Sequence, residues 1–129
     1  MGIQTLHSFQ SSNIFGKAEQ KFYELTDSLQ ARHTLAMKFS DIEKLIENDG
    51  RELLRLLLQA HIDSRGVGDV GQSIDAIDGV IRTHKRIGER QIKSIFGAIE
   101  CERLGYGNRC VDSLFPKDSH LNLPVVLEF

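Results

Sequence analysis

Residues 90–103 read RQIKSIFGAIECER, and apolar and polar side chains alternate on both sides of Phe96–Gly97. A period of two residues is typical of β-strands, so this segment predicts an antiparallel hairpin. Pairing Ile95 with Ala98 separates an apolar face from a charged face. The apolar face holds Ile92 opposite Cys101 and Ser94 opposite Ile99, and the charged face holds Lys93 opposite Glu100 and Gln91 opposite Glu102.

The sequence on either side of this hairpin predicts two further strands, one around Val80–His84 and one near Val111–Phe115. A hairpin alone is marginally stable in water, so additional strands would stabilise it. We therefore expect a small antiparallel sheet in the C-terminal half of the chain.

The N-terminal half has helical periodicity instead. Apolar residues recur every three or four positions over Lys17–Arg32. A second helix is predicted from Ser40, whose hydroxyl forms a capping box with Glu43. The Asn48–Gly50 segment has the composition of a turn, and Arg51–Arg65 predicts a third helix of strong helix formers.

The expected fold class is α+β, with helices followed by an antiparallel sheet in one compact domain. Along the chain we expect a poorly ordered N-terminus (1–16), a helical region (17–65), a loop (66–79), a β region (80–124) and a tail (125–129). A chain of 129 residues is long enough for one modest core. Its longest apolar runs are too short to cross a membrane, and no signal peptide is evident, so we expect a cytoplasmic location.

The third helix is apolar around more than half of its circumference, so it must be buried on two sides. We expect a second subunit to cover part of it and predict a homo-oligomer. The residues assigned to this contact are Leu53, Leu54, Leu57, Leu58 and His61.

Several short motifs have the composition of a catalytic or cofactor-binding site, but their context favours other interpretations. The segment Gly66–Gly71 matches the dinucleotide pattern G-x-G-x-x-G, but it follows a helix rather than a strand, so a loop is the better interpretation. His61 with Asp63, and Asp75 with Asp78, lack the arrangement that a metal site requires. The two cysteines, Cys101 and Cys110, are interpreted as free thiols. We expect no metal and no cofactor.

Charge is distributed unevenly. Residues 81–110 carry seven Lys or Arg against three Asp or Glu, whereas residues 1–80 carry eight against twelve. A local basic block favours a nucleic-acid partner, because Lys and Arg bind the phosphate backbone and a two-stranded ribbon fits the major groove. The alternative is a solvated sheet face whose cations pair with nearby glutamates. The predicted DNA-binding residues are Arg82, His84, Lys85, Arg86, Arg90, Lys93, Arg103 and Arg109.

Six short strings in fixed order carry a more specific signal. They are Gly50-Arg-Glu-Leu-Leu-Arg-Leu-Leu-Leu-Gln-Ala-His-Ile-Asp with Asp78-Gly79, His84-Lys-Arg with Arg90, Ser94-Ile-Phe-Gly, Arg103 with Tyr106, Ser113-Leu-Phe-Pro-Lys-Asp, and Leu121-Asn-Leu-Pro. This series, over residues 17–124, resembles the N-terminal region of bacterial insertion-sequence transposases of the IS-Kra-four family. Lys117 departs from the pattern, since the family tends to have leucine there.

The resemblance implies a longer protein, whose later RNase-H-like domain carries three metal-binding acidic residues for DNA cleavage. The present sequence stops soon after Leu121-Asn-Leu-Pro, so we expect a truncated chain without catalytic residues. The expected function is a non-catalytic module that binds double-stranded DNA and forms oligomers, acting as a competitor or regulator of transposition. The alternative is a protein–protein adaptor or inhibitor from a mobile element or phage, acting through its leucine-rich helix.

Overall fold

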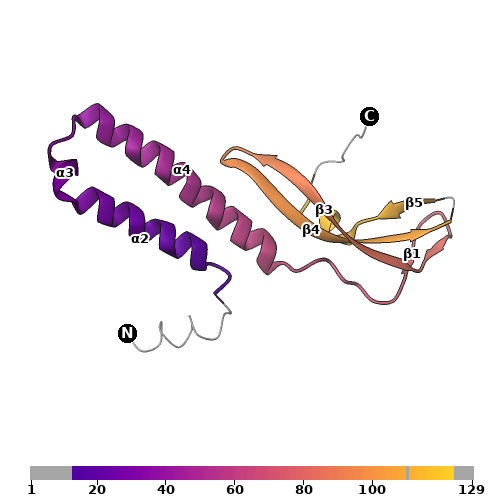
Figure 1. The fold of residues 1–129 in the computed structure, drawn as a ribbon. Helices are drawn as coiled ribbons and strands as arrows, with labels where there is room; N and C mark the ends of the chain where they lie inside the picture. Colours follow the sequence, from indigo (N-terminus) through magenta and orange to yellow (C-terminus); the bar gives the residue numbers. More distant parts are fainter. Residues whose placement is uncertain (1–12, 110, 124–129) are drawn as a thin grey trace. The chain divides into compact units, whose positions relative to one another are not determined.

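The computed structural model describes residues 13–109 and 111–123 of the chain. Helices come first and two antiparallel sheets follow, which confirms the α+β class (Figure 1). The chain divides into two compact units. The helical unit comprises Met1–Ser64 with Ile92–Ile99, and the sheet unit comprises Arg65–Gln91 with Glu100–Phe129. Within the described part of the chain, no helix has the length and apolarity needed to span a membrane.

The helical unit is an antiparallel helical hairpin (Figure 1). Its helices are α2 (Gly16–Gln30), the short α3 (Arg32–Leu35) and α4 (Phe39–Ser64). Ala18 and Leu25 of α2 are buried, as the predicted 3.6-residue period requires. The helix ends where Ala31 adopts an extended conformation, and the hydroxyl of buried Thr34 donates a hydrogen bond to the carbonyl of Ser28. The same carbonyl, in the last turn of α2, also accepts from the Ala31 N–H at 3.2 Å.

The predicted turn at Asn48–Gly50 is wrong, because α4 runs through it without a break. A glycine inside a helix costs only about 1 kcal/mol relative to alanine. Good helix formers on both sides and packing against α2 exceed that cost. Asp49 contributes to this packing through an ion pair with Lys21 of α2, 3.7 Å apart. Ser40 lies inside α4, which begins at Phe39, so it is not the residue preceding the helix as predicted.

The predicted hairpin is formed by β3 (His84–Ser94) and β4 (Gly97–Asn108). Its turn is Ile95–Phe96, one residue earlier than the sequence predicted. The Gln91 amide correspondingly donates to the Glu100 carboxylate at 3.2 Å, not to Glu102. The predicted division of faces is nevertheless correct, because Ile99 and Cys101 are buried while the alternate residues are exposed. Cys101 is a free thiol, and Cys110 lies outside the described residues.

Two arginines of α4 hold the tip of this hairpin within the helical unit. The Arg51 guanidinium donates to the Ile95 carbonyl at 2.7 Å, and that of Arg55 donates to the Ala98 carbonyl at 3.3 Å. Arg55 is itself oriented by two hydrogen bonds to the Glu52 carboxylate, at 2.8 and 2.9 Å. These contacts supply side-chain donors to two carbonyl groups near the turn of the ribbon.

The sheet unit contains a two-stranded ribbon of β1 (Ile74–Asp75) and β2 (Ile81–Arg82), and the sheet β3-β4-β5. The two predicted strands correspond to β2 and to β5 (Val111–Leu114). Only β5 joins the hairpin's sheet as expected, because β2 pairs instead with β1, which was not predicted. Central strand β4 pairs antiparallel with β5, with an irregularity between Tyr106 and Asn108. The short helix α5 (Pro116–His120) was also not predicted. It begins with proline, which is tolerated there because the first N–H groups of a helix have no partner within the helix.

Buried Tyr106 anchors the glycine-rich loop to the sheet. Its hydroxyl donates to the Gly71 carbonyl at 2.7 Å and accepts from the Val70 N–H at 3.1 Å. Gly66, Gly68 and Gly71 all have positive φ values, which side chains disfavour. The glycines therefore shape a structural loop, in agreement with the interpretation made from the sequence.

Candidate nucleic-acid interface

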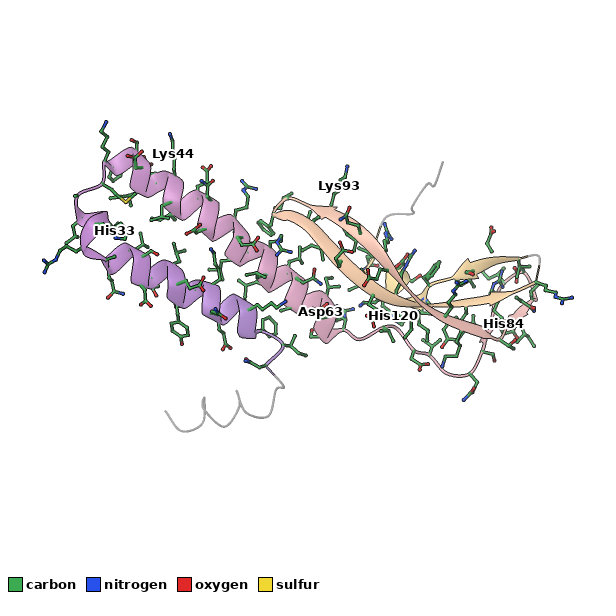
Figure 2. The ribbon with its side chains drawn as sticks, viewed as in Figure 1. His33, Lys44, Asp63, His84, Lys93 and His120 are labelled. Atoms are coloured by element: carbon green, nitrogen blue, oxygen red, sulfur yellow. The ribbon has the colours of Figure 1, made fainter. Side chains whose placement is uncertain are left out.

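The predicted basic residues divide into two groups according to their surroundings. His84, Arg86, Arg103 and Arg109 line one groove of about 600 Å³ in the sheet unit. Arg82, Lys85, Arg90 and Lys93 do not line it. Figure 2 labels His84 and Lys93 near opposite ends of β3, and Lys93 belongs to the helical unit. The structure therefore brings together half of the predicted set.

Arg82 is buried, with only 3% of its surface exposed, and its contacts stabilise the fold. Its guanidinium donates two hydrogen bonds to the Asp78 carboxylate, at 2.7 and 3.0 Å, and a third to the Asp112 carbonyl at 2.9 Å. The hydrogen bonds from Arg82, followed by that from the Val80 N–H, lower the pKa of Asp78 to about 2. Arg82 thus links the β1–β2 ribbon to β5 and has little surface for a ligand.

Lys85 lies on the sheet face opposite to its neighbours His84 and Arg86, because side chains alternate along a strand. Its ammonium lies 3.1 Å from Asp69 Oδ1 and 5.8 Å from the centre of the Tyr106 ring. Hydrogen bonds to Asp69 from the Gly71 N–H, then Lys85, then the Tyr106 hydroxyl lower the pKa of this carboxyl. Lys85 therefore helps to hold the glycine-rich loop.

Arg90 and Arg103 share the carboxylate of Asp118 in α5. Arg90 Nη1 lies 3.1 Å from Asp118 Oδ2, and Arg103 donates to the same oxygen. The Arg103 guanidinium also stacks on the Phe115 ring, 3.7 Å from its centre. Both arginine side chains are about nine-tenths buried, with exposed fractions of 10% and 11%. Asp118 therefore pairs with both guanidinium groups, and one of them, Arg103, lines the groove.

Arg86 and Arg109 are different, because both are exposed and neither forms an ion pair with any residue that the structure describes. Three arginines line the groove and Glu89 is its acidic residue, so positive charge exceeds negative charge in the lining. Exposed guanidinium groups bind phosphate with a planar fork of donors. The groove is therefore suited to bind an anionic ligand.

Sequence reasoning missed the glycines and the aromatic residue of the groove. Gly88, Gly105 and Gly107 line it together with Ser113 and Phe115. A glycine within a strand often marks a close approach of another backbone or a ligand, and that signal was present in the sequence. Phe115 could not be placed without knowing that β5 lies beside β4.

The predicted oligomerisation residues lie on α4 around two apolar hollows in the helical unit. Leu53 and Leu57 line one of about 230 Å³ with Phe15 and Phe22, and Leu53 and Leu54 line another of about 540 Å³ with Ile46, Ile95 and Phe96. Leu54 and Leu57 remain 44% and 40% exposed. Leu58 is half-buried and His61 exposed, and neither lines these hollows.

In the described ranges 13–109 and 111–123, no three His, Cys, Asp or Glu side chains are grouped so as to hold a metal ion. Comparison of the chain with protein-family models, with curated proteins and with solved structures found no match.

Proposed function

We propose that this chain is a non-catalytic module that binds double-stranded DNA and associates with itself, resembling the N-terminal part of an insertion-sequence transposase. The observation that carries the proposal is the groove lined by Arg86, Arg103 and Arg109. Contacts between cationic side chains and phosphates release counterions and supply most of the affinity of non-specific DNA binding. The protein would act in the cytoplasm.

Self-association is assigned to the helical unit. Phe22, Leu54 and Leu57 are 50%, 44% and 40% exposed, although large apolar side chains gain stability when they are buried. Exposed apolar surface that is continuous over neighbouring helices is typical of protein interfaces. A copy of the chain bound through this surface would present two basic grooves to the same DNA, which strengthens binding without new contacts.

A module of this kind would regulate transposition by occupying the ends of an element, or by joining oligomers of a complete transposase, without cutting DNA. The second candidate function is a protein–protein adaptor or inhibitor. The apolar hollows beside Leu53 favour it, because they could equally hold a side chain from a different protein.

Fluorescence anisotropy of a labelled duplex, titrated with the full chain at several salt concentrations, distinguishes the two functions. The DNA-binding module should bind with micromolar or tighter affinity and weaken steeply between about 50 and 200 mM salt. Light scattering on the same samples should give a mass above that of one chain. A folded multimer that does not bind the duplex at low salt would contradict DNA binding and favour the adaptor.

A further inference from the structure

We propose that the groove over Gly88, Gly105 and Gly107 takes a single sugar–phosphate backbone of the duplex, and that the tip of the β3–β4 hairpin does not enter the DNA. This inference rests on the proposed DNA-binding function and specifies its site. It differs from the sequence-based expectation that the two-stranded ribbon would enter the major groove. If the groove is the site, substitutions at its end of β3 weaken duplex binding. If the hairpin tip is the site, substitutions at the other end of β3 do so.

The glycines leave the middle of the sheet face without side chains. A Cβ atom added at Gly88 would meet no atom within 4 Å, so the space above this residue is open. At Gly105 and Gly107 the added atom would lie 2.7 Å from the Phe115 ring and 3.1 Å from the Ser113 hydroxyl. Phe115 and Ser113 therefore bound the groove on the β5 side, and the open floor lies along β3.

The cations of the groove are spread along the strands. Arg103 and Arg109 are six residues apart, which at about 3.3 Å per residue corresponds to roughly 20 Å. A small anion such as inorganic phosphate would reach only one end of such a row. One strand of a duplex carries a charge for about every 3.4 Å of helix axis, so it can contact Arg86, Arg103 and Arg109 together.

Arg103 is held in place before any ligand binds. Its hydrogen bond to Asp118 and its stacking on Phe115 fix the guanidinium, so little side-chain entropy remains to be lost. Arg86 and Arg109 are exposed and can adjust to the phosphates. Arg103 would hold one phosphate in a defined place, and Arg86 and Arg109 would adjust to its neighbours. Such contacts position the DNA backbone without reading its base sequence.

The groove can be blocked without changing any charge. Gly88→Val adds three carbon atoms to the open floor, and valine favours strands, so the variant should fold. Ala98→Val is the control, because Ala98 is an exposed residue of β4 that lines neither the groove nor the two apolar hollows. We expect Gly88→Val to weaken duplex binding at least about 10-fold, equivalent to the loss of one good phosphate contact, and Ala98→Val to leave it unchanged.

A second pair of variants tests the same site by charge and does not depend on how Gly88→Val folds. Arg86→Gln and Lys93→Gln each remove one exposed cation of β3, but only Arg86 lines the groove. Arg86→Gln should lower the salt slope of duplex binding by about 1, and Lys93→Gln should not change it.

Three outcomes would overturn the inference. If the wild-type chain binds the duplex and Lys93→Gln weakens binding while Gly88→Val and Arg86→Gln do not, the hairpin tip is the site and only the groove assignment fails. If the wild-type chain does not bind the duplex at low salt, the proposed function fails as well. If a polyglutamate peptide binds tightly and the duplex cannot displace it, the groove serves an acidic protein segment.

Discussion

The helical unit exposes apolar side chains, whereas the sheet unit buries charged ones. In the helical unit, α2 and α4 pack together yet leave apolar residues exposed around two hollows, including Phe22 and Leu57. In the sheet unit, charged side chains are buried, as at Arg82 and Lys117, and the groove is basic. The difference indicates that one unit is suited to bind protein and the other to bind an anion. Variants should therefore separate the two properties.

The largest effect is expected from reversing two charges of the groove. In Arg86→Glu/Arg109→Glu, two phosphate contacts are replaced by repulsion, so duplex affinity should fall at least about 100-fold and the salt slope by about 2. Fluorescence anisotropy measures both quantities. The mass of the protein by light scattering should not change, since neither residue belongs to the helical unit. Unaltered DNA binding in this variant would exclude the groove.

The converse change removes apolar surface from the helical unit. In Phe22→Lys/Leu57→Lys, two exposed side chains of one hollow become charged, which opposes their burial against another copy. The mass should fall to that of one chain, 14.6 kDa. DNA binding should weaken only through the loss of the second groove. An oligomer that persists in this variant would place the subunit contact elsewhere.

Within the sheet unit, Asp118→Asn tests the shared carboxylate. Removing its charge takes away the carboxylate that the Arg90 and Arg103 guanidinium groups share, and both side chains are largely buried. We expect a loss of about 2 kcal/mol in the free energy of unfolding, measured by urea denaturation. The Asp63→Asn control, at an exposed carboxylate on α4, should have almost no effect. Equal stabilities of the two variants would contradict the role given to Asp118.

Lys117 is 2% exposed, and its ammonium donates to the Glu102 carbonyl at 2.8 Å. Burying a cation against one neutral acceptor is costly, and an apolar side chain avoids that cost. Lys117→Leu, which introduces the residue common in the resembling family, should raise the free energy of unfolding by about 1 kcal/mol. A less stable variant would mean that this hydrogen bond outweighs the burial of charge.

The smallest effect concerns pH. The pKa of Asp78 is about 2 in the folded chain and about 4 when unfolded, so the unfolded state binds the proton first. The stabilisation from the Asp78–Arg82 pair is therefore complete above about pH 4 and is lost as the pH falls towards 2. Thermal melts of the wild type and Asp78→Asn should differ at pH 7 and converge below pH 4. A constant difference over this range would rule out the ionised carboxylate as its source.

Local periodicity predicted most of the fold. The alternation in residues 90–103 specified the hairpin and its two faces, and the 3.6-residue period specified α2 and the second half of α4. The errors arose where tertiary contacts outweigh local preference. Asn48–Gly50 is helical because α2 packs beside it and Lys21 pairs with Asp49. The hairpin turn lies at Ile95–Phe96, where Arg51 binds the Ile95 carbonyl.

The candidate site was less predictable than the fold. Composition identified a basic segment but could not separate Arg86, which is exposed, from Arg82, which is buried against Asp78. That distinction depends on the β1–β2 ribbon, whose strands are only two residues long and carry little signal. The groove itself requires the register of β4 with β5, which joins Gly107 to Ser113 across the sheet.

The division of roles between the two units can be measured residue by residue. In an NMR titration of the isotopically labelled chain with a short duplex, the backbone amide signals of residues 84–90, 103–109 and 113–115 should shift, and those of α2 and the first half of α4 should not. Dilution of the free protein should instead shift signals around Phe22, Leu54 and Leu57. Shifts of the α4 signals on adding DNA, without shifts along β3 and β4, would contradict the account.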